Sequence, residues 1–368
     1  MNNDSPSPLF RIFVDLELGL PDENDDGHVV PFSATLFHQY VVVPRVKTGF
    51  INATGKVVIP PTLDEAGEFS EGLAPAAIDG KGGYIDGTGR WVIEPQFSHA
   101  SLFSSGLAAV GVEDDEFFGF IDRSGRYVIP PRFYTAGNFC SGFAWVSSED
   151  ASTRGRGLYG FIDARGEEVV PLVYLGADDF SEGMAMVEEP RFRDCVQVDF
   201  APTESLYGFV NTAGLCVIPC RLEFAQSFSE GLAPARMNGK AGCIDPHGEW
   251  QIEPRFEAIG QFHDGLAPAN AGGRWGYIDH GGQFVIPPRF RSANSFSEGL
   301  AWLARVWVSG RVPGEGYVNL KGKVVIPGPF EQAGDFRDGL ALVRYGGLLG
   351  YINREAEWIW RGWNVPHR

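Results

Sequence analysis

One short element, Gly-aromatic-aliphatic-Asx, recurs along almost the whole chain. It begins at Gly49, Gly83, Gly119, Gly160, Gly208, Gly242, Gly276, Gly316 and Gly350. From each of the first eight glycines to the alanine of the next Gly-Leu-Ala-like element the distance is always 25 residues, as from Gly49 to Ala74. From that alanine to the next glycine it varies between 9 and 23 residues. The constant segment is therefore a packed module whose register tolerates no slip, and the variable one is a surface connection.

Local chemistry predicts antiparallel strands inside this module. Gly-Leu-Ala-Pro-Ala is a short strand that turns back through pairs such as Asp79-Gly80, in which both residues can adopt positive φ. Gly-Tyr-Ile-Asp returns as a half-buried strand, and Asp86 with Gly89 predicts the next turn. A third strand runs through Val-Ile-Pro, where prolines such as Pro60 discourage edge pairing. Each unit is thus a three-stranded meander plus a connection that can form a fourth strand.

The composition agrees with an all-β fold. Glycine (48) and proline (25) are so frequent that no stretch without either exceeds 12 residues. This is too short for a membrane-spanning helix or a coiled coil. Because 44% of the residues are hydrophobic and 13% aromatic, the chain has enough apolar material for a core and is not disordered.

The units divide the chain into three parts. Residues 1–48 are predicted to form an atypical N-terminal cap, with a strand over Leu9–Leu18 and a degenerate Gly-Leu-Ala strand over Phe32–Val43 that serves the unit at Gly49. Residues 49–362 hold about nine repeats of 34–48 residues, and 363–368 are a C-terminal tail. The last repeat ends after Trp358-Ile359-Trp360 without a following segment.

A single meander has little to bury its aromatic face against, so neighbouring units must stack. Two architectures remain open, a propeller-like ring or arc and an open superhelical β array. Nine units exceed the four to eight blades typical of propellers. We nevertheless favour the ring slightly, because the N-terminal strand can complete the last repeat.

The charge excludes some partners. The chain carries 47 acidic and 30 basic residues, a net charge of −17. Nucleic acid and anionic membranes both require a basic face, so neither is expected as a partner. The N-terminus has no basic and apolar leader, and five cysteines do not make a disulfide framework. We therefore expect a cytoplasmic protein.

The combination of Phe-Ser-Glu-Gly-Leu-Ala, Gly-Tyr-Ile-Asp and Gly-x-x-Val-Ile-Pro-Pro resembles the WG-repeat family, which is widespread in bacteria. The Trp-Gly pair itself occurs at Trp275-Gly276, and the resemblance extends from about Gly49 to Gly362. It implies an all-β repeat array and supplies no catalytic residues to transfer.

Two acidic positions recur in the repeat. The Asx position holds asparagine in four units, so a role in the turn is favoured over chemistry. A second position precedes Gly-Leu-Ala, where a solvated turn residue is expected; the alternative is a ladder of carboxylates for a cationic partner or for glycoside hydrolysis. Its acidic members are Glu71, Glu182, Glu230, Asp264, Glu298 and Asp338, with Ser105 and Ser141 in the other copies.

We predict no metal and no cofactor. Cys216 and Cys220 have a spacing that suits zinc only if two further ligands lie nearby, and the histidines form no metal-binding motif. Gly155–Gly160 matches the dinucleotide-binding pattern G-x-G-x-x-G. It runs into a strand, however, where that site requires a helix.

The variable connection is enlarged at Glu113–Phe118, Ser147–Tyr159, Glu188–Tyr207 and Arg305–Glu315. Because the same connection grows each time, these insertions are predicted to emerge on one face, which in repeat proteins is often the binding face. Neutral drift of loop length is the competing explanation. The candidate partner-binding residues, rich in arginine and aromatic groups, are Arg154, Arg156, Arg191, Phe192, Arg193, Arg305, Trp307 and Arg311.

The sequence thus predicts a non-enzymatic repeat protein that presents a surface to a protein or peptide partner. Two alternatives are a glycan-active or other hydrolytic enzyme that uses the acidic residues between repeats, and a purely structural scaffold. The sequence assigns neither the identity of the partner nor an oligomeric state.

Overall fold

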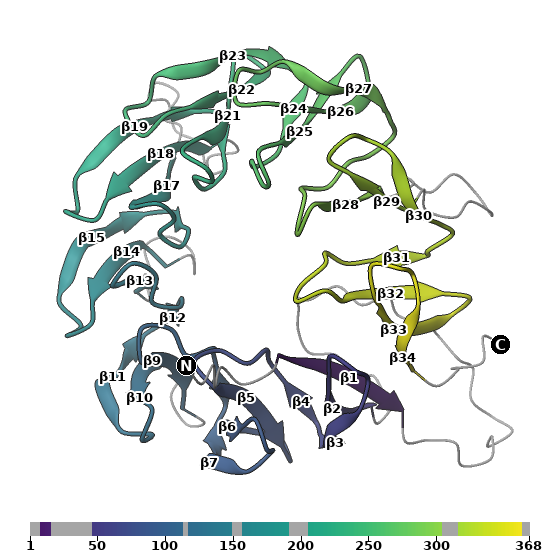
Figure 1. The fold of residues 1–368 in the computed structure, drawn as a ribbon. Helices are drawn as coiled ribbons and strands as arrows, with labels where there is room; N and C mark the ends of the chain where they lie inside the picture. Colours follow the sequence, from purple (N-terminus) through teal and green to yellow (C-terminus); the bar gives the residue numbers. More distant parts are fainter. Residues whose placement is uncertain are drawn as a thin grey trace, which may run out of the picture.

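The computed structural model of the chain describes residues 8–15, 46–112, 117–148, 157–190, 205–303 and 316–362. Every regular element in these ranges is a β-strand, and the strands form nine small antiparallel sheets. The sheets follow one another around a ring, a nine-bladed β-propeller (Figure 1). The predicted all-β repeat fold is confirmed, and the open superhelical alternative is wrong. No helix long and apolar enough to cross a membrane is found among the described residues.

The blades are numbered in chain order. Blade 1 contains β1 (Leu9–Asp15), β2 (Val46–Asn52) and β3 (Val57–Leu63); blade 2 contains β4 (Glu65–Ala66), β5 (Leu73–Ile78), β6 (Lys81–Asp86) and β7 (Trp91–Phe97); blade 3 contains β8 (His99–Ala100), β9 (Leu107–Gly111), β10 (Phe118–Asp122) and β11 (Tyr127–Phe133). Blade 4 contains β12 (Thr135–Ala136), β13 (Phe143–Ser147), β14 (Tyr159–Asp163) and β15 (Glu168–Tyr174); blade 5 contains β16 (Gly176–Ala177), β17 (Met184–Pro190), β18 (Ser205–Asn211) and β19 (Cys216–Leu222); blade 6 contains β20 (Phe224–Ala225), β21 (Ala233–Met237), β22 (Lys240–Ile244) and β23 (Trp250–Phe256). Blade 7 contains β24 (Ala258–Ile259), β25 (Ala267–Ala271), β26 (Arg274–Ile278) and β27 (Phe284–Phe290); blade 8 contains β28 (Leu300–Leu303), β29 (Gly316–Asn319) and β30 (Val324–Pro327); blade 9 contains β31 (Gln332–Ala333), β32 (Ala341–Tyr345), β33 (Leu348–Ile352) and β34 (Trp358–Arg361).

The strands of a four-stranded blade run from the centre of the ring outward in chain order (Figure 1). A two-residue strand lies innermost, the Gly-Leu-Ala and Gly-Tyr-Ile-Asp strands follow, and the Val-Ile-Pro strand is the outer edge. The sequence repeat is offset from the blade, because the constant 25-residue segment starts in one blade and ends in the next, as from Gly49 in blade 1 to Ala74 in blade 2. Its constant length therefore reflects the packing between consecutive blades, an interface that we call a seam.

The glycine of Gly-Tyr-Ile-Asp is required by a close approach of two backbones. In blade 2 the pairing of β6 with β7 runs Tyr84↔Ile93 and then Gly82↔Phe97, so the outer strand bulges. A Cβ on Gly83 would lie 2.5 Å from the carbonyl oxygen of Ile93. Only glycine lets the bulged outer strand come this close.

The hydrophobic core lies at the seams. The aromatic residue of Gly-Tyr-Ile-Asp in one blade packs on the phenylalanine that precedes Gly-Leu-Ala in the next. The ring centroids of Tyr84 and Phe103 are 4.6 Å apart, and those of Tyr277 and Phe296 are also 4.6 Å apart. Both tyrosines are completely buried, and the Tyr84 hydroxyl donates a hydrogen bond to the carbonyl oxygen of Ser101. Eight of the nine seams have an edge-to-face or tilted aromatic pair of this kind. At the seam between blades 6 and 7, Cys243 packs in the cluster of Phe262 instead.

The N-terminal strand closes the ring. β1 pairs with β2, and Phe10↔Ile51 in blade 1 matches Ala74↔Ile85 in blade 2, so β1 takes the place of a Gly-Leu-Ala strand. The strand predicted over Leu9–Leu18 is confirmed over Leu9–Asp15. The prediction that Phe32–Val43 supplies the strand beside Gly49 is wrong, because β1 occupies that position; Phe32–Val43 lies outside the described residues.

Contacts on both sides hold β1 in place. On one side the ring of Phe10 lies 5.4 Å from that of Tyr351 in blade 9, within a buried cluster that includes Ile12 and Leu340. On the other side the Arg11 guanidinium donates to Glu68 Oε1 of blade 2 at 2.8 Å. The last repeat, which starts at Gly350, therefore receives its missing Gly-Leu-Ala strand from the other end of the chain, as predicted.

We expect Phe10→Ala to destabilise the ring by about 3–5 kcal/mol, because it removes the apolar contact that joins blades 1 and 9. Urea unfolding followed by tryptophan fluorescence measures this change. Val57→Ala, a truncation of a half-exposed side chain in the same blade, is the matched control. Equal effects of the two substitutions would show that closure does not depend on β1.

Candidate functional site

The connections of each blade lie on two opposite faces of the ring. On one face are the turn between the first and second strands, such as Ser70–Leu73, and the Asx turn between the third and fourth, such as Asp86–Gly89. We call this the Asx face. The opposite face carries the hairpin between the second and third strands, and we call it the hairpin face.

The Asx turns have the structural role that was predicted. The Asp86 carboxylate accepts hydrogen bonds from the backbone N–H groups of Thr88 and Arg90, and Gly89 has a φ of 83°. The hydrogen bond from the Thr88 hydroxyl lowers the pKa of Asp86 most. Asn52 makes the same backbone bonds to Thr54 and Lys56, so the turn does not need a charged residue.

The acidic residue before Gly-Leu-Ala joins consecutive blades. Glu71 itself has a φ of 51° and Gly72 a φ of 79°, which makes the pair a two-residue type I′ turn. The Glu71 carboxylate accepts the N–H of Gly106 in the next blade at 3.1 Å. The predicted role as an exposed turn residue is therefore confirmed, and the bond to the next blade adds a role that was not predicted. The same bond recurs from Gly231 to Glu182, Gly265 to Glu230, Gly299 to Asp264, and Gly339 to Glu298.

Serines next to these carboxylates form a second ladder between blades. The Ser70 hydroxyl donates to the carbonyl oxygen of Phe103 at 2.6 Å, and Ser229 donates to Phe262 at 2.6 Å. The carboxylates and the serines therefore both join consecutive blades through hydrogen bonds. Burial acts to raise the pKa of Glu298, but hydrogen bonds from Arg354 and from backbone N–H groups outweigh it, so the pKa is lowered. A general acid would need a raised pKa instead.

The short hairpins on the opposite face are type I′ turns, as predicted. Both central residues have positive φ in Asp79-Gly80, Asn238-Gly239, Gly272-Gly273 and Gly346-Gly347. These hairpins belong to blades 2, 6, 7 and 9.

An acidic residue just before the innermost strand holds each short hairpin. The Glu223 carboxylate accepts the N–H groups of Asn238 and Gly239 at 3.0 and 2.8 Å. We call the four residues that bind hairpins in this way the hairpin carboxylates. They are Asp64, Glu223, Glu257 and Glu331.

The hairpin carboxylate is absent wherever the hairpin is enlarged. In blades 3, 4, 5 and 8 the same position holds Ser98, Tyr134, Leu175 and Arg291. A carboxylate is thus kept only where a two-residue turn offers N–H groups to bind. Our sequence analysis missed this signal, although it is visible once the residue before each innermost strand is compared with the length of the following hairpin.

The enlarged connections all leave the ring from the hairpin face. They join β9 to β10, β13 to β14, β17 to β18 and β28 to β29, the second and third strands of their blades. Residues 16–45 join the corresponding strands of blade 1, so blade 1 adds a fifth enlarged connection that the sequence analysis assigned to a cap. The eight candidate residues all lie outside the described residues; they are Arg154, Arg156, Arg191, Phe192, Arg193, Arg305, Trp307 and Arg311.

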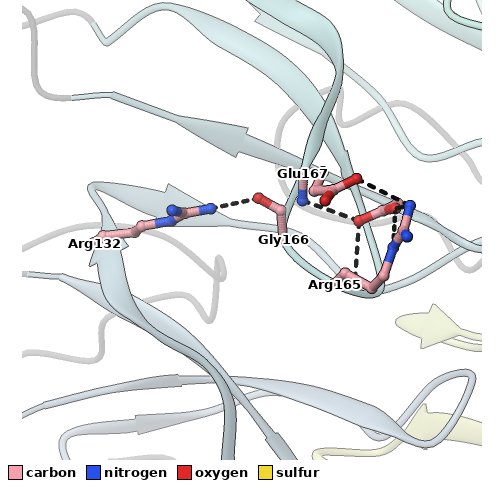
Figure 2. Close-up of polar contacts among 5 residues, drawn as sticks. Arg132, Arg165, Gly166 and Glu167 are labelled. Carbon is pink, nitrogen blue, oxygen red and sulfur yellow. Dashed lines mark hydrogen bonds and ion pairs between the residues drawn. The ribbon is translucent and has the colours of Figure 1, made fainter.

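The outer strands are also joined across the seams. The Arg132 guanidinium of blade 3 donates to the carbonyl oxygen of Gly166 in the Asx turn of blade 4 (Figure 2). Beside it, Arg165 binds Glu167 at 2.9 Å (Figure 2). Arg255 and Arg289 repeat the Arg132 contact at later seams, with Gly282 and Gly322.

The described cysteines lack the features of metal ligands. Burial raises the pKa of Cys243 and of Cys220 to about 12, which keeps both thiols protonated. Within the described ranges no three histidine, cysteine or acidic residues are grouped to hold a metal ion.

The family profile described as WG containing repeat matches most of the chain. The matched segments are residues 49–81, 83–114, 118–150, 159–189, 207–240, 242–275, 275–303 and 316–348. The chain belongs to the WG-repeat family. Each matched segment of this WG-repeat protein spans a seam, and the ninth seam is built from the two ends of the array.

The chain is also similar to solved structures. The chain is similar to a crystal structure of a eukaryotic initiation factor, with 10% identity, a TM-score of 0.58, and coverage of 85% of this chain and 93% of that chain. Apo AztD from Citrobacter koseri matches with 12% identity, a TM-score of 0.40, and coverage of 87% and 92%. No curated protein matches the sequence. At these identities the likeness concerns the fold alone.

We expect Glu223→Ala to weaken the hairpin of blade 6 by about 1–3 kcal/mol, because two backbone N–H groups lose a charged acceptor. Amide hydrogen exchange of Asn238 and Gly239 should accelerate accordingly. Exchange of Gly272 and Gly273, which Glu257 holds in the next blade, is the internal control. Unchanged exchange at Asn238 would contradict the assigned role.

The contribution of Asp64 to stability should depend on pH. A hydrogen bond from Lys47 lowers the pKa of Asp64, and the N–H of Asp79 acts in the same direction. The ionised carboxylate therefore stabilises the fold above the unfolded-state pKa of about 4, and the contribution is lost as the pH falls through the lower folded-state pKa. Asp64→Asn should lower the free energy of unfolding at pH 7. The difference in the free energy of unfolding between this variant and the wild type should shrink as the pH falls towards about 2. Urea titrations at several pH values measure this difference, with Glu94→Gln, a substitution of an exposed carboxylate, as the control. A difference between Asp64→Asn and the wild type that does not change with pH would contradict this linkage.

Proposed function

We propose that this WG-repeat propeller is a non-enzymatic binding protein whose enlarged hairpins contact a protein or peptide partner. The hairpins of blades 3, 4 and 5 are consecutive in the ring, and those of blades 8 and 1 flank blade 9. All five leave from the hairpin face, so the blades differ most from one another in the length of the connections on that face.

The observation that carries this proposal is the exchange of the hairpin carboxylate. At every blade with a short hairpin this position is acidic. In the enlarged blades 3, 4 and 5 it holds Ser98, Tyr134 and Leu175, and Arg291 stands at the aligned position of blade 8, which has no innermost strand. The enlarged hairpins were therefore remodelled together with their base, as expected of a surface under selection for binding.

The composition of the enlarged connections supports a protein partner. They hold arginines and aromatic residues, such as Arg191, Phe192 and Trp307. Arginine, tyrosine and tryptophan are the residues most enriched at the energetic centres of protein interfaces. The carboxylates of the Asx face, by contrast, are engaged between blades, which favours binding over hydrolysis as the function.

The test converts an enlarged blade into a short one. Replacing Pro190–Ser205 by Asn-Gly, together with Leu175→Glu, copies blade 6 onto blade 5, where Glu189 pairs with Leu206 as Met237 pairs with Lys240. We expect the variant to fold with an unchanged or higher melting temperature, because the new turn is a favoured type I′ hairpin with an acceptor for its N–H groups. Proteins that co-purify with the intact chain, quantified by mass spectrometry, should fall at least about tenfold.

A matched control replaces Gly272-Gly273 in blade 7 by Asn-Gly, which alters a hairpin on the same face without changing its length. This variant should retain every partner. Equal recovery of partners by the intact chain, the control and shortened variants of blades 3, 4, 5 and 8 would refute the proposal.

A further inference from the structure

The outer strands of blades 1, 2 and 3 open in the same way, with a basic residue followed by two apolar ones. The basic residue directly follows the glycine of the Asx turn. We call these three segments the rim band; they are Lys56-Val57-Val58, Arg90-Trp91-Val92 and Arg126-Tyr127-Val128. In blades 4 to 9 the position of the basic residue holds Glu167, Leu215, Glu249, Gln283, Lys323 and Glu357. Blades 1 to 3 are thus the one run of consecutive blades with this pattern.

The three segments follow one another along the outside of the ring, where β3, β7 and β11 form the outer edges of their blades (Figure 1). The Asx turn of each blade packs on the outer strand of the preceding blade. A Cβ on Gly89 would lie 3.1 Å from the side chain of Ile59, and a Cβ on Gly125 would lie 3.2 Å from that of Ile93. The rim band is therefore one continuous surface and not three separate patches.

The apolar side chains of the rim band are open to solvent. Val92 is 49% exposed and Val128 is 44% exposed, and Val57, Val58 and Tyr127 are exposed to a similar degree. The fold itself does not use this apolar area. A contiguous apolar surface bordered by charged groups is typical of a site that binds another macromolecule.

The basic side chains of the rim band have no partner within the described part of the chain. Those of Lys56, Arg90 and Arg126 make no hydrogen bond or ion pair with another described residue. In the next blade, by contrast, Arg165 is paired with Glu167 (Figure 2). Three exposed cations thus stand beside the exposed apolar side chains.

The neighbouring carboxylates do not neutralise this surface. Asp86 and Asp122 each accept three hydrogen bonds inside their own Asx turns. Glu94 is the single acidic residue of β3, β7 and β11. The ionised groups that a partner can reach here are therefore mainly basic, and carboxylates of a partner would complement them.

We propose that the rim band binds an extended acidic segment of a partner protein. Aliphatic side chains of this segment lie on the exposed valines, and its carboxylates pair with Lys56, Arg90 and Arg126. Pro60 and Pro130 lack an N–H and discourage the addition of a strand to β3 or β11, so side chains hold the segment.

The shape of the rim favours a polypeptide over an anionic membrane. The band follows the convex outside of the ring (Figure 1). An extended chain can follow this curve and contact all three blades, whereas a flat bilayer cannot. The contact lies on a different surface from the hairpin face and goes beyond the function proposed above.

The test uses a display library of random 12-residue peptides selected on the full-length protein. We expect the selected peptides to combine aspartate or glutamate with leucine, isoleucine or valine. Their affinity, measured by fluorescence anisotropy, should fall at least about tenfold on the double variant Arg90→Glu and Arg126→Glu. Affinity for the wild type should also fall as the salt concentration rises, because the basic groups are exposed.

A second double variant, Val92→Ser and Val128→Ser, tests the apolar part of the contact. It should weaken binding by about threefold or more, because apolar area is no longer buried on binding. All four substituted side chains are exposed, so circular dichroism should show an unchanged fold for both double variants.

Lys323→Glu is the matched control. Lys323 occupies the same position in blade 8 and precedes the exposed Val324-Val325, but it lies outside the rim band. This variant should bind the selected peptides as the wild type does. Full binding by the arginine double variant, equal loss on Lys323→Glu, failure to select any peptide, or selected peptides without acidic residues would each overturn the assignment.

Two further measurements separate the alternatives. Sedimentation with vesicles that contain phosphatidylserine should show no binding; binding that disappears in the arginine double variant would replace the acidic peptide by an anionic membrane. The variant with the shortened hairpin in blade 5 should keep full affinity for the selected peptides. Loss of their binding in that variant would refute the rim band, whereas retention of co-purified partners there would refute only the function proposed for the hairpin face.

Discussion

The apolar contact across each seam, an aromatic pair at eight of the nine and Cys243 with Phe262 at the other, is the interaction on which the whole ring depends. A single blade of three or four short strands buries too little to be stable alone. Tyr84 against Phe103, and its equivalents at other seams, join each blade to the next. Such a pair adds about 0.5–1.5 kcal/mol beyond the burial of its area. Because Phe10 and Tyr351 make the same kind of contact between blades 1 and 9, the array has no free end at which its core is exposed.

Polar residues of the Asx face reinforce these seams. Carboxylates such as Glu71 accept N–H groups of the next blade, and serines such as Ser70 donate to its carbonyl oxygens. The recurring acidic residues, which in the sequence suggest a row of functional carboxylates, therefore have a structural role between blades. On the hairpin face, blades are also joined by individual contacts, such as the hydrogen bond from Lys47 to Asp64 and the one from Arg236 to the carbonyl oxygen of Glu257. The connections on this face nevertheless differ in length from blade to blade.

Divergence on the hairpin face separates two kinds of blade. Blades 2, 6, 7 and 9 have a type I′ hairpin and a hairpin carboxylate. The enlarged blades 3, 4, 5 and 8 have neither the two-residue turn nor the carboxylate. The hairpin and the residue at its base have thus changed together.

The sequence by itself determined the strands, the turns and the length of the module between blades, because these depend on residues close together in the chain. An Asx residue followed three positions later by glycine, such as Asp86 with Gly89, forms a turn from local hydrogen bonds alone. The Gly-Leu-Ala and Gly-Tyr-Ile-Asp strands likewise pair through a local hairpin. Only the tertiary structure decided that β1 belongs to blade 1 and that Glu71 binds Gly106. These contacts join residues 31 or more positions apart. Ring closure brings these residues together, and it depends on all nine seams and not on any single repeat.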